Sequence, residues 1–96
     1  MFIIDTTDSF INMDNIESID IFDYGSYTQI TAYCIKSEFC IYRNSNHDKA
    51  KQIYEFIKRA ILKGFNCILI QDTADYVVVY KKGNLNATEK WKLEVD

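Results

Sequence analysis

The chain has 96 residues, of which 48% are hydrophobic and 26% are charged, which is the balance of one globular domain. No apolar run approaches the roughly 20 residues that a membrane-spanning helix needs, and the first five residues lack the basic flank of a signal peptide. Six Phe, seven Tyr and one Trp supply ample core material, so a disordered chain is excluded. We therefore expect one cytoplasmic domain.

The net charge of −3 is unevenly distributed along the chain. Residues 1–35 contain no Lys or Arg, whereas residues 36–96 carry eleven basic and eight acidic side chains. The acidic side chains of the first segment are Asp5, Asp8, Asp14, Glu17, Asp20 and Asp23. The low sequence pI of about 5.0 argues against nonspecific binding of nucleic acid, which depends on Lys and Arg neutralising phosphates.

In chain order, the first half of the sequence predicts short strands. Residues 2–5 and 10–13 are apolar pieces separated by a turn, and residues 16–22 alternate Ile19 and Ile21 with Ser18 and Asp20. A turn at residues 23–26 follows. Residues 27–35 and 39–43 are rich in β-branched and aromatic side chains, which predicts a hairpin around Lys36-Ser37.

One amphipathic helix is predicted at about residues 46–63. Ser45 is the expected N-cap with Asn46 as the competing cap, and Asp48 suits the positive end of the helix dipole. Gly64 ends the helix. The apolar stripe at three- and four-residue spacing comprises Ala50, Ile53, Ile57, Ala60 and Ile61.

After the helix, residues 67–71 and 76–81 predict a second hairpin, and the alternation of Trp91, Leu93 and Val95 predicts a last strand with one buried face. The expected fold class is α+β. It comprises an antiparallel sheet of about five to seven strands with one helix between an N-terminal meander and a C-terminal hairpin plus strand. Because one helix covers one sheet face, a homodimer is a further expectation.

No catalytic or cofactor motif is present, and we expect a non-enzymatic protein without cofactor. His47 is the single imidazole and has no nucleophile at a recognisable spacing. Asp5, Asp8 and Asp14 could surround a divalent ion, but Asp residues at turns more simply terminate strands, so no metal site is predicted.

The three cysteines are interpreted as buried free thiols, since their spacing fits no zinc site. Cys34 and Cys40 lie on opposite arms of the predicted hairpin. The register, which the sequence leaves open, decides whether they share a face.

Two surfaces are candidates for partner binding. The first is the acidic face, Asp5, Asp8, Asp14, Glu17, Asp20 and Asp23, which would meet a basic groove of a partner protein. The alternative is a nucleic-acid interface formed by Lys51, Lys58, Arg59 and Leu62 of the helix with Tyr24 and Tyr27. Glu55 and Arg59 have the spacing of an ion pair, which favours a solvated helix face over a phosphate-binding one, so direct nucleic-acid binding is disfavoured.

The segment Phe10-Ile11-Asn12-Met13-Asp14-Asn15-Ile16, followed by Glu17-Ser18-Ile19, resembles the opening of small uncharacterised proteins of low-GC Gram-positive bacteria and their phages. The resemblance covers about residues 9–63 and implies a sheet followed by a Ser-capped helix, with no activity. By analogy of size and charge, small acidic phage proteins suggest an anti-CRISPR-like inhibitor. The leading hypothesis is therefore a protein-binding module that blocks a host nucleic-acid-binding complex.

Overall fold

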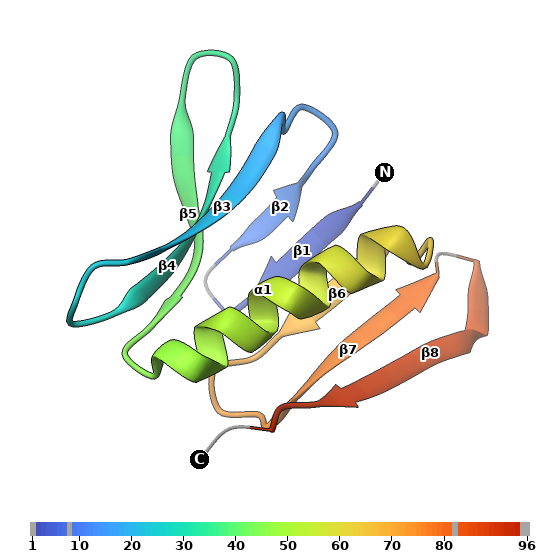
Figure 1. Cartoon of the computed structure of the whole chain (residues 1–96). Coiled ribbons are helices and arrows are strands. Elements are labelled where there is room, and N and C mark those ends of the chain that lie inside the picture. Colours follow the sequence, from blue (N-terminus) through green and yellow to red (C-terminus); the bar gives the residue numbers. More distant parts are fainter. Residues whose placement is uncertain (1, 8, 82, 95–96) are drawn as a thin grey trace.

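The computed structural model describes residues 2–7, 9–81 and 83–94. Its elements are β1 (Ile3–Thr6), β2 (Phe10–Asn12), β3 (Ser18–Asp23), β4 (Thr28–Tyr33), β5 (Glu38–Asn44), α1 (His47–Leu62), β6 (Cys67–Ile70), β7 (Tyr76–Lys81) and β8 (Asn84–Lys92). Strands with one helix confirm the α+β class (Figure 1). Among the described residues, no helix combines the length and the apolar character that a membrane crossing requires.

The strands form two sheets. A five-stranded sheet has the order β2-β1-β6-β7-β8, and a three-stranded antiparallel sheet has the order β3-β4-β5. All neighbouring strands in the larger sheet are antiparallel except β1 and β6, which run parallel. A parallel pair needs a long crossover, and here the crossover contains the whole second sheet and α1. This non-local pairing has no signal in the sequence periodicity, which explains why a single antiparallel sheet was expected.

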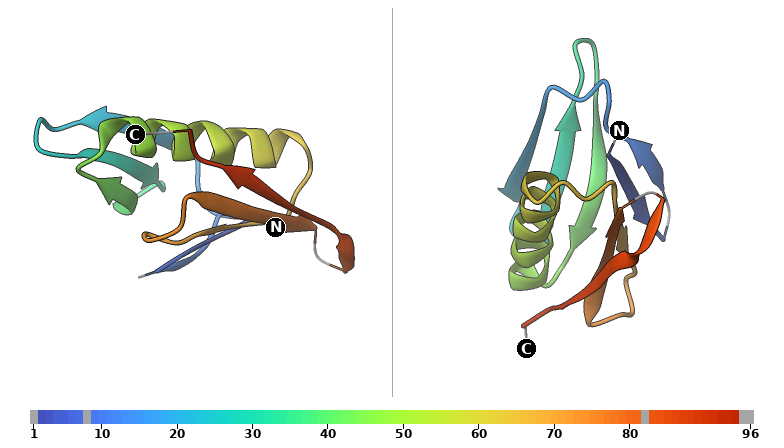
Figure 2. Two further views of the ribbon diagram at one scale, coloured as in Figure 1. Left: turned by 90° about the horizontal axis from the view of Figure 1, so that it is seen from below. Right: turned by 90° about the vertical axis from the view of Figure 1, so that its right-hand side faces the viewer.

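Helix α1 lies against one face of each sheet, so the three elements enclose a single core (Figures 1 and 2). Figure 2 shows the helix on one side of the five-stranded sheet and in front of the three-stranded one. Ile53 and Ile57 of the helix are fully buried, as are Ile68 of the larger sheet and Ile30 of the smaller. The helix is thus the element through which the two sheets are packed together.

The N-cap of α1 is Asn46, so the prediction of a Ser45 cap is wrong. The side-chain oxygen of Asn46 accepts a hydrogen bond from the backbone N–H of Lys49 at 3.1 Å. The preceding Asn44 fixes this geometry, because its Oδ1 accepts from the backbone N–H of Asn46 at 2.8 Å. Asn46 can reach the first turn because it lies directly before the first helical residue.

The predicted apolar stripe is confirmed for Ala50, Ile53, Ile57 and Ala60, which are all buried. Ile61 differs, because 44% of it is exposed. Leu62 lies nine positions from Ile53, at the opposite side of the helix, and is 86% exposed.

The expected buried face of the last segment is confirmed at Trp91 and Leu93. The Trp91 ring makes edge contacts with Phe56 and Phe65, at centroid distances of 5.5 and 5.6 Å, and Leu93 is buried. Val95, the third residue of the expected alternation, lies outside the described residues.

Candidate functional site

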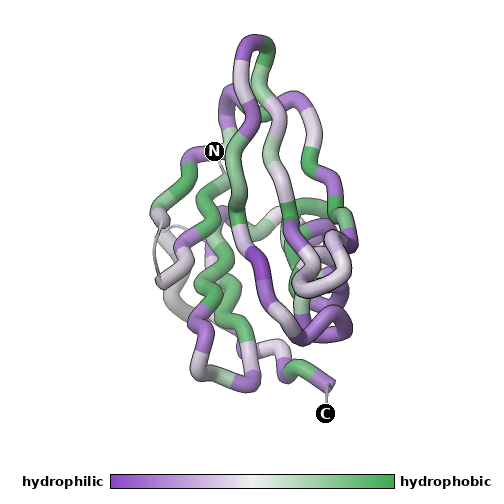
Figure 3. Tube along the Cα trace, turned by 90° about the vertical axis from the view of Figure 1, so that its left-hand side faces the viewer, coloured by the Kyte–Doolittle hydropathy of each residue, from purple (hydrophilic) through white to green (hydrophobic). Residues whose placement is uncertain are grey.

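The three-stranded sheet has one face against α1 and one open face. On β3, Ile19 and Ile21 point toward the core, so Asp20 and Phe22 lie on the other face. The register carries this face across the sheet, placing Asp20 beside Thr31 and Cys40 and placing Phe22 beside Gln29 and Arg43. We call this surface the open face; it comprises Asp20, Phe22, Tyr24, Tyr27, Gln29, Thr31, Tyr33, Glu38, Cys40 and Arg43. Figure 3 views the molecule from the side on which the three-stranded sheet lies.

An aromatic cluster occupies the β3–β4 end of the open face. The rings of Phe22 and Tyr24 are 4.9 Å apart, those of Tyr24 and Tyr27 are stacked at 5.2 Å, and the Arg43 guanidinium lies 5.4 Å from the Tyr27 ring. Phe22 is 62% exposed and Tyr24 is 53% exposed. We use the name aromatic cluster for Phe22, Tyr24, Tyr27 and Arg43.

The β3–β4 turn holds the cluster in place. The backbone N–H of Tyr24 donates to the carbonyl of Tyr27 at 2.9 Å, which extends the strand ladder and keeps both rings on one face. Gly25 has a φ of +94°, a conformation that other residues rarely adopt, and its N–H donates to Oδ1 of Asp23 at 2.8 Å. The turn is therefore closed by local bonds that leave the aromatic rings free for contact.

The other end of the open face is acidic. Glu38 is paired with Tyr33 across β4 and β5, and Asp20 lies on the adjacent β3. Desolvation by neighbouring groups, and then the carboxylates of Glu38 and Asp20, raise the pKa of the Tyr33 hydroxyl.

The six predicted acidic residues do not lie on one face. Asp5 lies on β1 in the five-stranded sheet, whereas Asp20 lies on the open face of the other sheet. Asp14 and Glu17 line shallow hollows at the connection between β2 and β3. Asp23 faces α1, and Asp8 lies outside the described residues. Proximity in the sequence therefore does not translate into one acidic surface.

The cations of the alternative helix interface are engaged within the chain. Nζ of Lys58 lies 3.0 Å from Oε1 of Glu55, and the Arg59 guanidinium lies over the rings of Phe56 and Trp91, at 5.3 and 5.5 Å. Arg59 is thus positioned by aromatic rings, and Glu55 forms its ion pair with Lys58 rather than with the expected Arg59.

Lys51, Tyr24 and Tyr27, which also belong to the alternative interface, do not lie on one surface. Lys51 lines a shallow hollow together with the carboxylates Asp48, Glu55 and Glu94. Tyr24 and Tyr27 lie on the open face, which is the side of the three-stranded sheet turned away from α1. The helix cations and these tyrosines therefore cannot contact one short nucleic-acid segment together.

The surroundings of His47 do not form a catalytic relay. Its Nδ1 is hydrogen-bonded to Oγ1 of Thr28 and lies 3.5 Å from Oδ1 of Asp23. In a hydroxyl–imidazole–carboxylate relay the hydroxyl and the carboxylate bind different ring nitrogens, whereas here both are at Nδ1. The arrangement ties the start of α1 to the β3–β4 hairpin.

The register settles the relation of Cys34 and Cys40. The backbone N–H of Cys34 donates to the carbonyl of Ser37, and Cys40 is paired with Thr31 on the open face. Cys34 directly follows β4, three residues after Thr31, so continuing the alternation of the strand points it away from the open face on which Cys40 lies. The expectation of three buried thiols is right for Cys67 but wrong for Cys40, which is exposed on an outward-facing position of β5, and Cys34 is only half-buried. Desolvation by neighbouring groups raises the pKa of Cys40 although Arg43 opposes this, and burial raises the pKa of Cys67, so neither is an activated thiolate.

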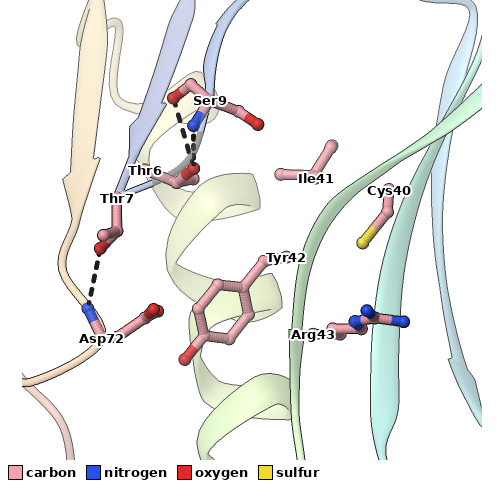
Figure 4. Close-up of a pocket in the computed structure, with 8 residues that line it drawn as sticks. All are labelled: Thr6, Thr7, Ser9, Cys40, Ile41, Tyr42, Arg43 and Asp72. Carbon is pink, nitrogen blue, oxygen red and sulfur yellow. Dashed lines mark hydrogen bonds between the residues drawn. The ribbon is translucent and has the colours of Figure 1, made fainter.

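A cavity of about 140 Å³ lies where β5 passes the end of β1 (Figure 4). It is lined by Thr6, Thr7, Ser9, Cys40, Ile41, Tyr42, Arg43 and Asp72. Several of its hydroxyls are used locally: Oγ1 of Thr6 accepts from the N–H of Ser9 at 3.0 Å, and Oγ1 of Thr7 accepts from the N–H of Asp72 at 3.4 Å. The cavity lies between the two sheets. Its lining residues include no nucleophile that is paired with a base.

Within the described ranges, no group of three or more His, Cys, Asp or Glu side chains could hold a metal ion. Comparison of the chain with protein-family models, with curated proteins and with solved structures finds no match. The resemblance of residues 9–63 to small Gram-positive phage proteins stays a prediction.

Sequence reasoning identified Tyr24, Tyr27 and Asp20 of the open face but not Phe22 or Arg43. The alternation in β3 carried a signal for Phe22, because it follows the inward Ile21. Arg43 had no such signal. A β-bulge in β5, opposite Ile30 and Thr31 of β4, shifts the register and turns Arg43 onto the open face.

Proposed function

We propose that this chain is a non-enzymatic protein-binding module whose binding surface is the open face of the three-stranded sheet. The observation that carries the proposal is the aromatic cluster, in which Phe22 and Tyr24 expose more than half of their surface beside Tyr27 and Arg43. Isolated exposed rings are common on proteins, but four neighbouring side chains of the types enriched in interfaces form a contiguous patch.

The charges beside the cluster favour a partner with basic side chains. Asp20 and Glu38 flank Tyr33 on the open face, and Arg43 is held against the Tyr27 ring. The aromatic rings supply the contact area, and the carboxylates attract and orient the partner. The most concrete form of the proposal is an inhibitor of phage or mobile-element type, analogous to anti-CRISPR proteins, that occupies the basic groove of a host nucleic-acid-binding complex.

A nucleic-acid-binding module remains the competing function, because aromatic rings on a sheet face can stack with bases. Such a module also needs cations along the phosphate path. The open face offers Arg43 against two carboxylates, and the cations of α1 lie on the other side of the sheet. The geometry therefore supports a protein partner better than a nucleic acid.

The proposal is tested by capture on the immobilised chain from a lysate of its native host. We expect a protein to be retained by the wild type and lost from a variant carrying Phe22→Ser with Tyr24→Ser. The matched control is Leu62→Ser, which removes an apolar side chain that is 86% exposed elsewhere on the surface and should leave retention unchanged.

A second arm uses short single-stranded DNA and RNA as probes at low ionic strength. Binding of either probe that weakens with salt and is lost in the double variant would establish the nucleic-acid function instead. Equal protein retention by the wild type and the double variant would contradict the proposal.

A further inference from the structure

The five-stranded sheet also has a face turned away from α1, which we call the outer face. Side chains alternate along its strands, so the fully buried Ile4, Ile68 and Val79 mark the core side. The residues between them point outward. The outer face comprises Ile3, Asp5, Phe10, Asn12, Cys67, Leu69, Tyr76, Val78, Tyr80, Lys90 and Lys92.

Among the described elements none covers the outer face, as both views in Figure 2 show. Phe10 is 69% exposed and Tyr80 is 37% exposed, while Leu69 and Val78 at the centre are half-buried by their neighbours. This face is thus mainly apolar, with charges near its two sides, and it is separate from the open face of the other sheet.

One row of paired residues crosses all five strands of the outer face. Phe10 is paired with Asp5, Asp5 with Leu69, Leu69 with Val78, and Val78 with Lys90. The orientation of Lys90 is fixed by Tyr76, whose ring lies 4.9 Å from the Lys90 Nζ. From β1 to β8 the row therefore consists of an acidic side chain, two apolar side chains and a basic side chain.

We propose that the outer face binds a second copy of this chain. A two-fold axis parallel to the strands and passing between β6 and β7 would place Leu69 against Val78 of the other copy. The same axis would place Asp5 against Lys90, and it would do so twice, once at each side of the interface. The row is thus complementary to itself, as a two-fold interface requires.

The size of the shared face indicates a weak dimer. The proposed axis overlaps four strands, β1, β6, β7 and β8, of the two copies, whereas β2 lies outside the partner. With strands about 4.8 Å apart and about 3.4 Å per residue, four strands present a footprint of roughly 400 Å² on each copy. Two such footprints total about 800 Å², below the roughly 1,000 Å² of most stable specific interfaces, so we expect a reversible dimer with a dissociation constant in the high micromolar to millimolar range.

Sedimentation velocity over micromolar to millimolar protein concentrations tests this interface. Asp5→Lys and Lys90→Asp each bring like charges together twice, so each is expected to weaken dimerisation by about tenfold or more. The double variant Asp5→Lys with Lys90→Asp exchanges the charges and should restore dimerisation to within about threefold of the wild type. Circular dichroism verifies that each variant is folded. If Asp5→Lys does not fold, Lys90→Asp alone tests the interface, because Lys90 is exposed.

The matched control is Glu38→Lys, a charge reversal on the other sheet, which should leave dimerisation unchanged. A wild type that stays monomeric at millimolar concentration would overturn the proposal. So would a dimer that is insensitive to both single reversals, or one that the charge exchange does not restore. The assay uses purified chain alone, so its outcome is independent of whether the open face binds another protein.

Discussion

Replacing Ile57 by Ala is expected to lower the free energy of unfolding by about 3 to 4 kcal/mol. Ile57 is fully buried on the side of α1 that faces the core between the two sheets, so truncation removes apolar contacts and leaves a cavity. Urea denaturation followed by circular dichroism measures the effect. The loss is large because the helix is the element through which the sheets pack together.

The matched control is Ile61→Ala, which makes the same chemical change one turn later in the same helix. Ile61 is 44% exposed, so its truncation should cost less than about 1 kcal/mol. The sequence pattern alone places both residues in one apolar stripe and gives no reason for a difference. Equal losses for the two variants would contradict the packing of α1 described above.

Substituting both Phe22 and Tyr24 by Ala is expected to weaken binding to the retained partner by about 100-fold. Central aromatic side chains of an interface commonly contribute more than 1 kcal/mol each, and two such losses combine to about 2.7 kcal/mol. Folding should change little, because both rings are mainly exposed in the free chain. Isothermal titration calorimetry with the purified partner measures the change.

The control for this pair is Leu62→Ala, which should bind as the wild type does. Asp20→Lys on the open face should slow association and reduce its dependence on salt, because it removes attraction to a basic partner. An affinity for the double variant within twofold of the wild type would show that the aromatic cluster is not the binding surface.

Much of the local structure could be predicted from the sequence. The helix limits, the β4–β5 hairpin and the packing of Trp91 against the core all follow from periodicity, turn residues and capping signals within short windows. The cap itself was misassigned because Ser45 and Asn46 both have a side chain that can accept the bond. The position of the first helical residue decides between them.

Non-local geometry could not be predicted in the same way. The parallel pairing of β1 with β6 joins segments about sixty residues apart, and no local pattern specifies it. The bulge in β5 had a similar effect: it turns Tyr42 into the core and Arg43 onto the open face, whereas strict alternation from Cys40 would reverse both.

The candidate site shows the same division. Clustering of carboxylates in residues 1–35 suggested one acidic face, yet the chain distributes them over two sheets and a connection. The aromatic cluster draws its members from β3, the β3–β4 turn and β5, so it exists only once these strands pair. Charge along a sequence is therefore a weaker guide to a binding surface than the register of a sheet.

The most direct test of the central claim is photo-cross-linking in host lysate from two positions. One chain carries the photoreactive amino acid benzoyl-phenylalanine in place of Phe22 on the open face, and the other carries it in place of Leu62 on α1. We expect a protein to be cross-linked from position 22 and not from position 62. Cross-linking of the same protein from position 62 alone, or of nucleic acid from position 22, would contradict the assignment of the open face as a protein-binding surface.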